Sequence, residues 1–197
     1  MNRRLLTAIF PLALALLLLA VFLISRWPLW EQNLMSDHSP AAWLSSAQLL
    51  GASFLACRLG LDRTFNPLLS TWLAVAMATL AIDEQFMLHE QWKYGCADWF
   101  AICSHGWVRE LPMQAVALLG TLTLFHLAQR VPDRDFRHVL FASLGVGLFT
   151  LCLDLANGPA ILLPFEEAFE VSAEALFIGA LLIAAPSQGT GSQEHSP

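Results

Sequence analysis

Charged side chains are scarce in this chain of 197 residues, of which they make up 13%. Soluble globular domains carry about 25%, so the composition excludes an ordinary water-soluble fold. No basic stripe and no basic patch rich in aromatic residues is present. Nothing in the sequence therefore indicates nucleic-acid binding.

Several familiar catalytic signatures are also missing. The sequence contains no Gly-x-Ser-x-Gly elbow, no Walker loop, no Rossmann fingerprint and no His-Glu-x-x-His pair. Hydrolysis by a serine triad and nucleotide chemistry therefore have no support in the sequence.

Apolar residues are abundant instead, at 56% of the chain, with a mean hydropathy of +0.57. They fall in blocks about twenty residues long, the length that a helix needs to cross roughly 30 Å of hydrocarbon. The blocks lack the alternation of barrel strands. The sequence predicts an all-α integral membrane bundle in one domain, residues 1–185, followed by a disordered cytoplasmic tail, 186–197. The six predicted transmembrane helices are 5–25, 41–57, 67–88, 111–129, 138–155 and 164–185.

The distribution of basic residues predicts the orientation of these spans. Cytoplasmic loops of membrane proteins carry an excess of Lys and Arg. Seven basic residues lie on the side of the two termini, and three lie on the other side. We therefore expect a multi-pass protein of the bacterial inner membrane with both termini in the cytoplasm. The seven are Arg3, Arg4, Arg58, Arg63, Arg130, Arg134 and Arg137, and the three are Arg26, Lys93 and Arg109.

The third predicted span ends in an acidic stretch that contains Asp83, Glu84, His89 and Glu90. Asp83 lies 16 residues beyond Pro67, which corresponds to about 24 Å along a helix. The predicted orientation therefore places this stretch in the outer leaflet.

The sixth span opens with a second acidic stretch. Glu167, Glu170 and Glu174 are spaced i, i+3, i+7 and so form one helical stripe, which Glu166 flanks. Asp154, near the end of the fifth span, lies at a height similar to that of Asp83. We expect three helices to deliver carboxylates to one layer.

A metal ion would offset the charge of this layer. An ionised carboxylate at the bilayer centre costs at least about 2.5 kcal/mol, and carboxylates with histidine are ligands for Fe, Mn or Zn. We predict a metal site near the outer leaflet. If the protein is an enzyme, we expect a lipid-like substrate, with Glu174 or Asp154 as a catalytic base or as a partner of the ligands. The predicted ligands are Asp83, Glu84, His89, Glu90, Glu167 and Glu170.

Two other functions fit the same residues. Acidic residues inside a membrane often act as relays, so the protein can be a proton- or cation-coupled transporter. It can also be a non-catalytic assembly partner whose acids bind another subunit. The sequence does not choose among the three.

The predicted outer loop, residues 94–110, carries Cys96 and Cys103. The outer compartment permits disulfides, so we predict that these two cysteines form one. Trp92, Trp99, Phe100 and Trp107 around the loop are typical of the interfacial aromatic belt. Above a carboxylate layer, they can also line an entrance for a lipid head group.

The two acidic stretches together resemble a pattern found in a group of uncharacterised bacterial multi-pass membrane proteins. The motifs that carry the resemblance are Asp83-Glu84-x4-His89-Glu90, at the end of one span, and Glu166-Glu167-x2-Glu170, at the start of the last. The resemblance covers roughly the third to the sixth span. It implies that the two motifs belong together, and it implies no known activity.

Overall fold

The computed structural model describes residues 3–25, 27–29, 39–155 and 163–186. Within these ranges the protein is all-α, as predicted, and consists of eight α-helices and one short 3-10 helix, η1. The helices are α1 (Arg3–Ser25), α3 (Pro40–Leu61), α4 (Pro67–Phe86), α5 (Leu88–Trp99), η1 (Ala101–Ser104), α6 (Gly106–Arg109), α7 (Leu111–Arg130), α8 (Arg134–Leu155) and α9 (Leu163–Ala184).

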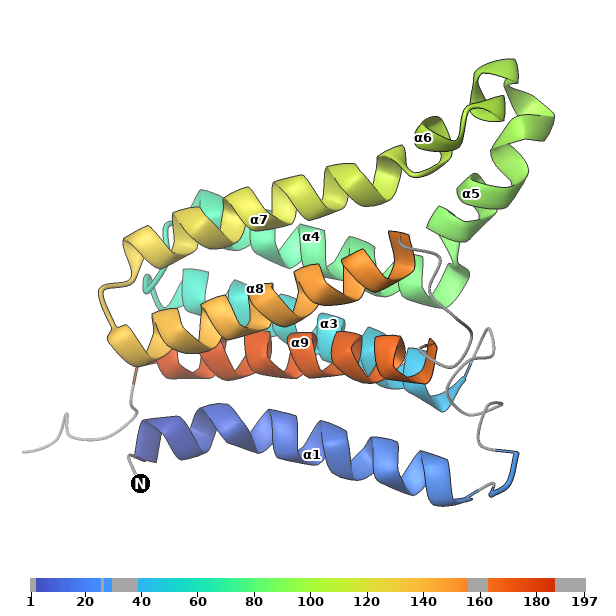
Figure 1. Cartoon of the computed structure of the whole chain (residues 1–197). Coiled ribbons are helices and arrows are strands. Elements are labelled where there is room, and N and C mark those ends of the chain that lie inside the picture. The colour runs from blue at the N-terminus through green and yellow to red at the C-terminus, as the bar shows by residue number, and fades with distance from the viewer. Residues whose placement is uncertain (1–2, 26, 30–38, 156–162, 187–197) are drawn as a thin grey trace, which may run out of the picture.

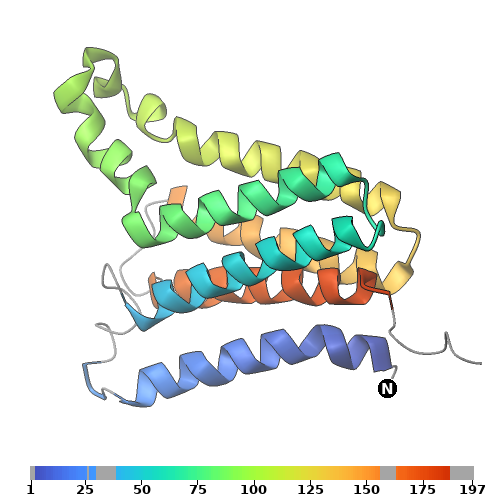
Figure 2. The ribbon, with the colours of Figure 1, turned by 180° about the vertical axis from the view of Figure 1, so that it is seen from behind.

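Six long helices lie side by side in a bundle (Figures 1 and 2). Four of them, α1, α3, α7 and α8, are long and apolar enough to cross a membrane. The other two, α4 and α9, have a similar length but carry the acidic residues singled out above. The predicted tail lies outside the described residues, apart from Pro186.

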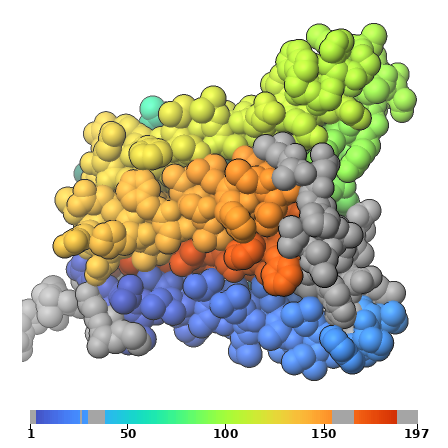
Figure 3. All heavy atoms as spheres, viewed as in Figure 1, coloured from blue at the N-terminus to red at the C-terminus, as the bar shows by residue number. Residues whose placement is uncertain are grey.

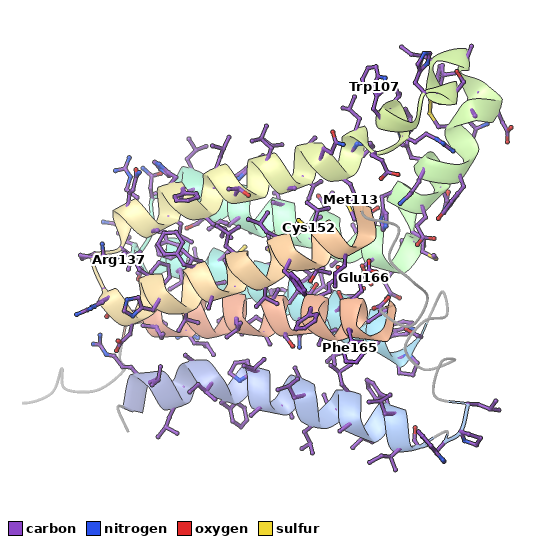
Figure 4. All side chains as sticks on the ribbon, in the orientation of Figure 1. Trp107, Met113, Arg137, Cys152, Phe165 and Glu166 are labelled. Carbon is purple, nitrogen blue, oxygen red and sulfur yellow. A yellow bond between two sulfur atoms is a disulfide. The ribbon has the colours of Figure 1, made fainter. Side chains whose placement is uncertain are left out.

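The two ends of the bundle differ in charge. At one end α4 ends and α9 begins, and we call it the acidic end. At the other end α1 and α8 begin, and we call it the arginine end. Figure 4 shows Glu166 near the acidic end and Arg137 near the arginine end.

Local sequence determines where two helices of the bundle begin. Ser39 caps α3, because its Oγ accepts a hydrogen bond of 3.1 Å from the Ala42 amide. Asn66 caps α4 in the same way, and its Oδ1 lies 2.9 Å from the Leu68 amide nitrogen. A proline follows each cap, at a position where its missing N–H group costs no helical hydrogen bond.

The end of the predicted third span differs from the structure. The helix ends at Phe86 rather than continuing to Leu88, because Met87 adopts a left-handed conformation with φ of 52°. The chain turns there and enters α5, which leaves the bundle.

The predicted loop, residues 94–110, is largely helical, and this corrects the sequence-based expectation. Residues 88–109, which we call the lobe, comprise α5, η1 and α6. Cys96 and Cys103, the predicted pair, form a disulfide with their Cα atoms 5.7 Å apart. Trp92 Nε1 also donates a 3.3 Å hydrogen bond to the Val108 carbonyl oxygen. These links stabilise short helices in a segment that has little apolar core, and the lobe projects from the bundle (Figure 3).

Small and hydroxyl side chains join α3 to α4. Ser46 Oγ donates to the Ala81 carbonyl oxygen at 3.2 Å, and Ser53 Oγ donates to that of Ala74 at 2.8 Å. Ala74 and Ala81 are buried. Small residues let helix backbones approach closely enough for such bonds.

The main hydrophobic core occupies the arginine half of the bundle. It combines the beginnings of α1, α4 and α8 with the ends of α3, α7 and α9. Leu127 and Ala128 of α7 belong to it, whereas most apolar side chains nearer the start of α7 are exposed. Figure 1 shows α7 leaning away from the bundle toward the acidic end. This arrangement leaves room for cavities there.

Candidate functional site

A cavity of about 530 Å³ lies in the acidic half of the bundle. Its walls come from α3, α4, α5, α7, α8 and α9. Much of the lining is apolar, and Leu49, Leu80, Met113 and Leu151 are examples. Its titratable lining residues are Asp83, Glu84, His89, Glu166, Glu170 and Glu174. The structure therefore brings acidic residues of both predicted stretches around one space.

The acids of α9 reach from the mouth of the bundle into its interior. Glu166, Glu170 and Glu174 are spaced four residues apart, which corresponds to steps of about 6 Å along one face of the helix. Glu167, predicted to belong to this stripe, is not among the lining residues, and Glu166 takes its place. Residues three and four positions before Glu170 lie side by side on the helix surface. Which of Glu166 and Glu167 lines the cavity therefore depends on where the cavity lies and not on the spacing.

Glu174, the deepest of these acids, is held by α3. Its Oε1 accepts a 2.7 Å hydrogen bond from Ser45 Oγ. With its amide nitrogen turned toward α9, Gln48 donates to Glu174 Oε2 at 3.2 Å and to the Val171 carbonyl oxygen at 2.9 Å. Sequence reasoning missed Ser45 and Gln48. The sequence feature that could have identified these two residues is their polarity within an otherwise apolar span.

Glu170 differs from Glu174 in its surroundings. Its side chain is partly buried and lines the cavity, and within the described ranges its carboxylate makes no hydrogen bond or ion pair. Glu170 lies one helical turn from Glu166 and one from Glu174. It is therefore the central acid of the stripe, and its oxygens are free to bind a ligand.

Asp83 and His89 form a pair at the turn between α4 and α5. Asp83 Oδ2 lies 2.8 Å from His89 Nδ1, and Asp83 Oδ1 accepts a 2.9 Å hydrogen bond from the His89 amide. The second bond caps the first turn of α5. The pair thus stabilises the corner of the fold as well as facing the cavity.

The hydrogen bond that the His89 ring makes to the Asp83 carboxylate raises the pKa of His89 above its ordinary value of 6.5, although burial lowers it. The negative charges of Asp83, Glu90 and Glu84 raise it further. Protonated His89 therefore stabilises the folded state fully below the ordinary pKa, and this contribution is lost as the pH rises through the raised value.

We expect Asp83→Asn to remove most of this pH dependence, because asparagine can still accept the His89 amide bond but carries no charge. The melting temperature of the variant should fall below that of the wild type when the pH is below the ordinary His89 pKa of 6.5, and the difference should shrink as the pH rises through the raised pKa. Asp98→Asn, at an exposed position of α5, is the matched control. A difference independent of pH would contradict the prediction.

The metal site predicted from the sequence gains no support from this arrangement. Within the described part of the chain, no group of three or more His, Cys, Asp and Glu residues is placed to hold a metal ion. Glu90, like Glu167, is not among the cavity-lining residues. Asp154 lies in the last turn of α8, and its side chain is outside what the structure describes.

The titratable residues of the cavity wall are mostly acidic. Five carboxylates line it, and no Lys or Arg is among the described residues of its wall. Lys93, in the neighbouring lobe, lies 3.4 Å from the Glu110 carboxylate. Ionised carboxylates that share a space of low dielectric constant repel one another. His89 pairs with Asp83, and protons or a bound cation would lower the remaining repulsion.

Comparisons of the chain with protein-family models, with curated proteins and with solved structures find no match.

Proposed function

We propose that this protein is a proton-coupled transporter that binds an organic cation in the acidic cavity. The observation that carries the proposal is the cavity lining, with five carboxylates and no Lys or Arg among its described residues. Such a lining attracts cations and repels phosphate and carboxylate ligands. When a cation enters, it takes over the charge compensation that protons provide in its absence.

An organic cation fits the geometry better than a metal ion does. A metal needs several ligand atoms within roughly 2.0–2.6 Å of one point. The described acids instead line part of a cavity of about 530 Å³ whose other walls are largely apolar. An ammonium group with its substituents can occupy such a volume and contact the carboxylates at hydrogen-bond or van der Waals distance.

The proposal includes six membrane spans, because α4 and α9 are as long as the four apolar helices beside them. Five of their six acids line the cavity, so these five do not need to contact lipid. The orientation follows from the seven basic residues at the arginine end, which favour the cytoplasm. The cavity then lies toward the outer face of the bacterial inner membrane.

Tetramethylammonium is the probe that tests the proposal, because it is permanently charged and can displace a proton without supplying one. Protein in weakly buffered nanodiscs of phosphatidylcholine should release protons, detected with a pH dye, when tetramethylammonium chloride is added. Glu170→Gln should abolish most of the release, because the central carboxylate is lost. Asp98→Asn is the matched control, since Asp98 is exposed and is not among the lining residues.

Two results would overturn the proposal. One is an absence of proton release from the wild-type protein, and the other is an equal release from Glu170→Gln. Elemental mass spectrometry of the same samples is the companion measurement. A stoichiometric amount of Fe, Mn or Zn that is lost in Glu170→Gln would favour the metal site instead.

Proteoliposomes test the transport step separately. An inward gradient of tetramethylammonium should drive protons out of vesicles that contain the wild-type protein, and the flux should be absent with Glu170→Gln. Binding without flux would leave a cation-binding protein and would remove the transporter assignment.

A further inference from the structure

The acidic cavity adjoins two cavities with mostly apolar linings that extend toward the arginine end. A second cavity, of about 260 Å³, shares Leu49, Met113 and Glu174 with it. A third, of about 300 Å³, shares Leu80 and Val116 with it. Val116 of α7 lines all three cavities. The three cavities are therefore neighbours along α7, with Val116 in the wall of each.

The inner part of this space is apolar. The third cavity has no charged residue in its described lining, and Glu174 is the only one in the second. Gly120 lines both, and a Cβ atom built on it meets no atom within 4 Å. The glycine thus leaves open volume where other residues would place a side chain.

The loose fit of α7 against α4 explains this space. Near the arginine end, Trp72 Nε1 of α4 donates a 3.0 Å hydrogen bond to Thr123 Oγ1 of α7. Both residues line the third cavity, so their bond lies at its inner end. Thr123 lies ten residues after Met113, which lines the acidic cavity, and this separation corresponds to about 15 Å along the helix. That length is half of a hydrocarbon core roughly 30 Å thick, the depth occupied by one lipid chain.

We propose that the ligand is a cationic amphiphile, with an ammonium head group among Glu166, Glu170 and Glu174 and a single alkyl chain along α7. This inference rests on the proposed function, since it names the class of cation that the acidic cavity binds. The acids account for the head group, and the apolar cavities account for the chain. A proton or a small hydrophilic cation would have no use for the apolar cavities.

Two trimethylammonium probes separate the head group from the chain. Tetramethylammonium and dodecyltrimethylammonium carry the same charge and differ in chain length. Proton release in nanodiscs gives the apparent affinity of the protein for each probe. The signal measured with Glu170→Gln is subtracted, because it contains the contribution of probe that adsorbs to lipid. Partition of the longer probe into lipid is the same for every variant, so the ratio of the two affinities can be compared between variants.

Gly120→Leu fills the apolar space without meeting a neighbouring atom at its Cβ. We expect it to lower the affinity ratio, dodecyl over tetramethyl, at least tenfold. Gly145→Leu is the matched control, because Gly145 of α8 also has nothing within 4 Å of a built Cβ and is not among the lining residues of the three cavities. The control should keep the wild-type ratio.

The possible failures can be told apart. If neither probe releases protons in a manner that depends on Glu170, the proposed function fails. If tetramethylammonium does so but Gly120→Leu keeps the wild-type ratio, the head-group site stands and the alkyl-chain inference is overturned. The release by tetramethylammonium also reports whether Gly120→Leu is folded.

Discussion

Gly179→Val is expected to separate α1 from the rest of the bundle. A Cβ atom on Gly179 would overlap the Ala8 carbonyl oxygen and would lie 3.1 Å from the Ala8 carbonyl carbon and Cα. These are backbone atoms of a buried position, and no rotamer change can move them. Because α1 packs mainly against α9, the clash acts on the contact that holds α1 in place.

The free energy of unfolding of Gly179→Val should fall by at least the upper end of the roughly 1–3 kcal/mol that overpacking usually costs. The measurement is the melting temperature of the purified protein in a mild detergent. Gly145→Val is the control, because it introduces the same β-branched residue into a helix at a site with open space around it. Equal melting temperatures for the two variants would show that the two helices do not approach so closely.

Phe136→Ala is expected to have the second large effect on stability. Phe136 has 0% exposure and belongs to the main core, in which it packs between helices at the arginine end. Its backbone amide donates a 3.0 Å hydrogen bond to Asp133 Oδ1, so the start of α8 holds the ring in a defined position. The surrounding backbone therefore cannot collapse readily into the space that the ring leaves.

The loss in the free energy of unfolding should lie at the lower end of the about 3–5 kcal/mol seen for buried Phe→Ala changes. Lipid is as apolar as the core, so the loss comes mainly from packing rather than from transfer out of water. Melting in detergent measures it, with Phe54→Ala as the control at a ring that is 73% exposed. A control that loses as much stability as Phe136→Ala would place the stabilising contacts outside this core.

These two predictions concern the close-packed half of the bundle, whereas the site occupies the other half. Tight contacts among all six long helices at the arginine end allow α7 to remain apart from α4 at the acidic end. Binding regions are commonly drawn from the less stable parts of a fold. Variants of Glu170 and Gly120 should therefore change ligand binding with less effect on melting than Gly179→Val or Phe136→Ala.

The role of Asp83 shows how one residue can serve both stability and function. Its two oxygens bind the backbone and the ring of His89, and it also lines the cavity. A loss of ligand binding in an Asp83 variant would thus report on the corner of the fold as well as on the site. Glu170 is the sharper test, since its carboxylate has no such structural partner among the described residues.

Hydrophobic block length by itself determined the helical class and the approximate bounds of the long helices. Helix formation in an apolar block is a local property, because each backbone group finds its partner four residues away. Pro67 at the start of α4 is an example of a boundary that local chemistry sets. The grouping of the acidic residues near one end was likewise predictable from helix direction and rise per residue.

Only the tertiary structure decided which acids share the cavity and what else surrounds them. Glu166 rather than Glu167 lines it because the rotation of α9 about its axis depends on packing against α1, α3 and α8, which the sequence spacing does not specify. Ser45 meets Glu174 across 129 positions of sequence. The apolar space along α7 depends on how far two helices stand apart, which is set by the balance of contacts over the whole bundle and not by any local motif.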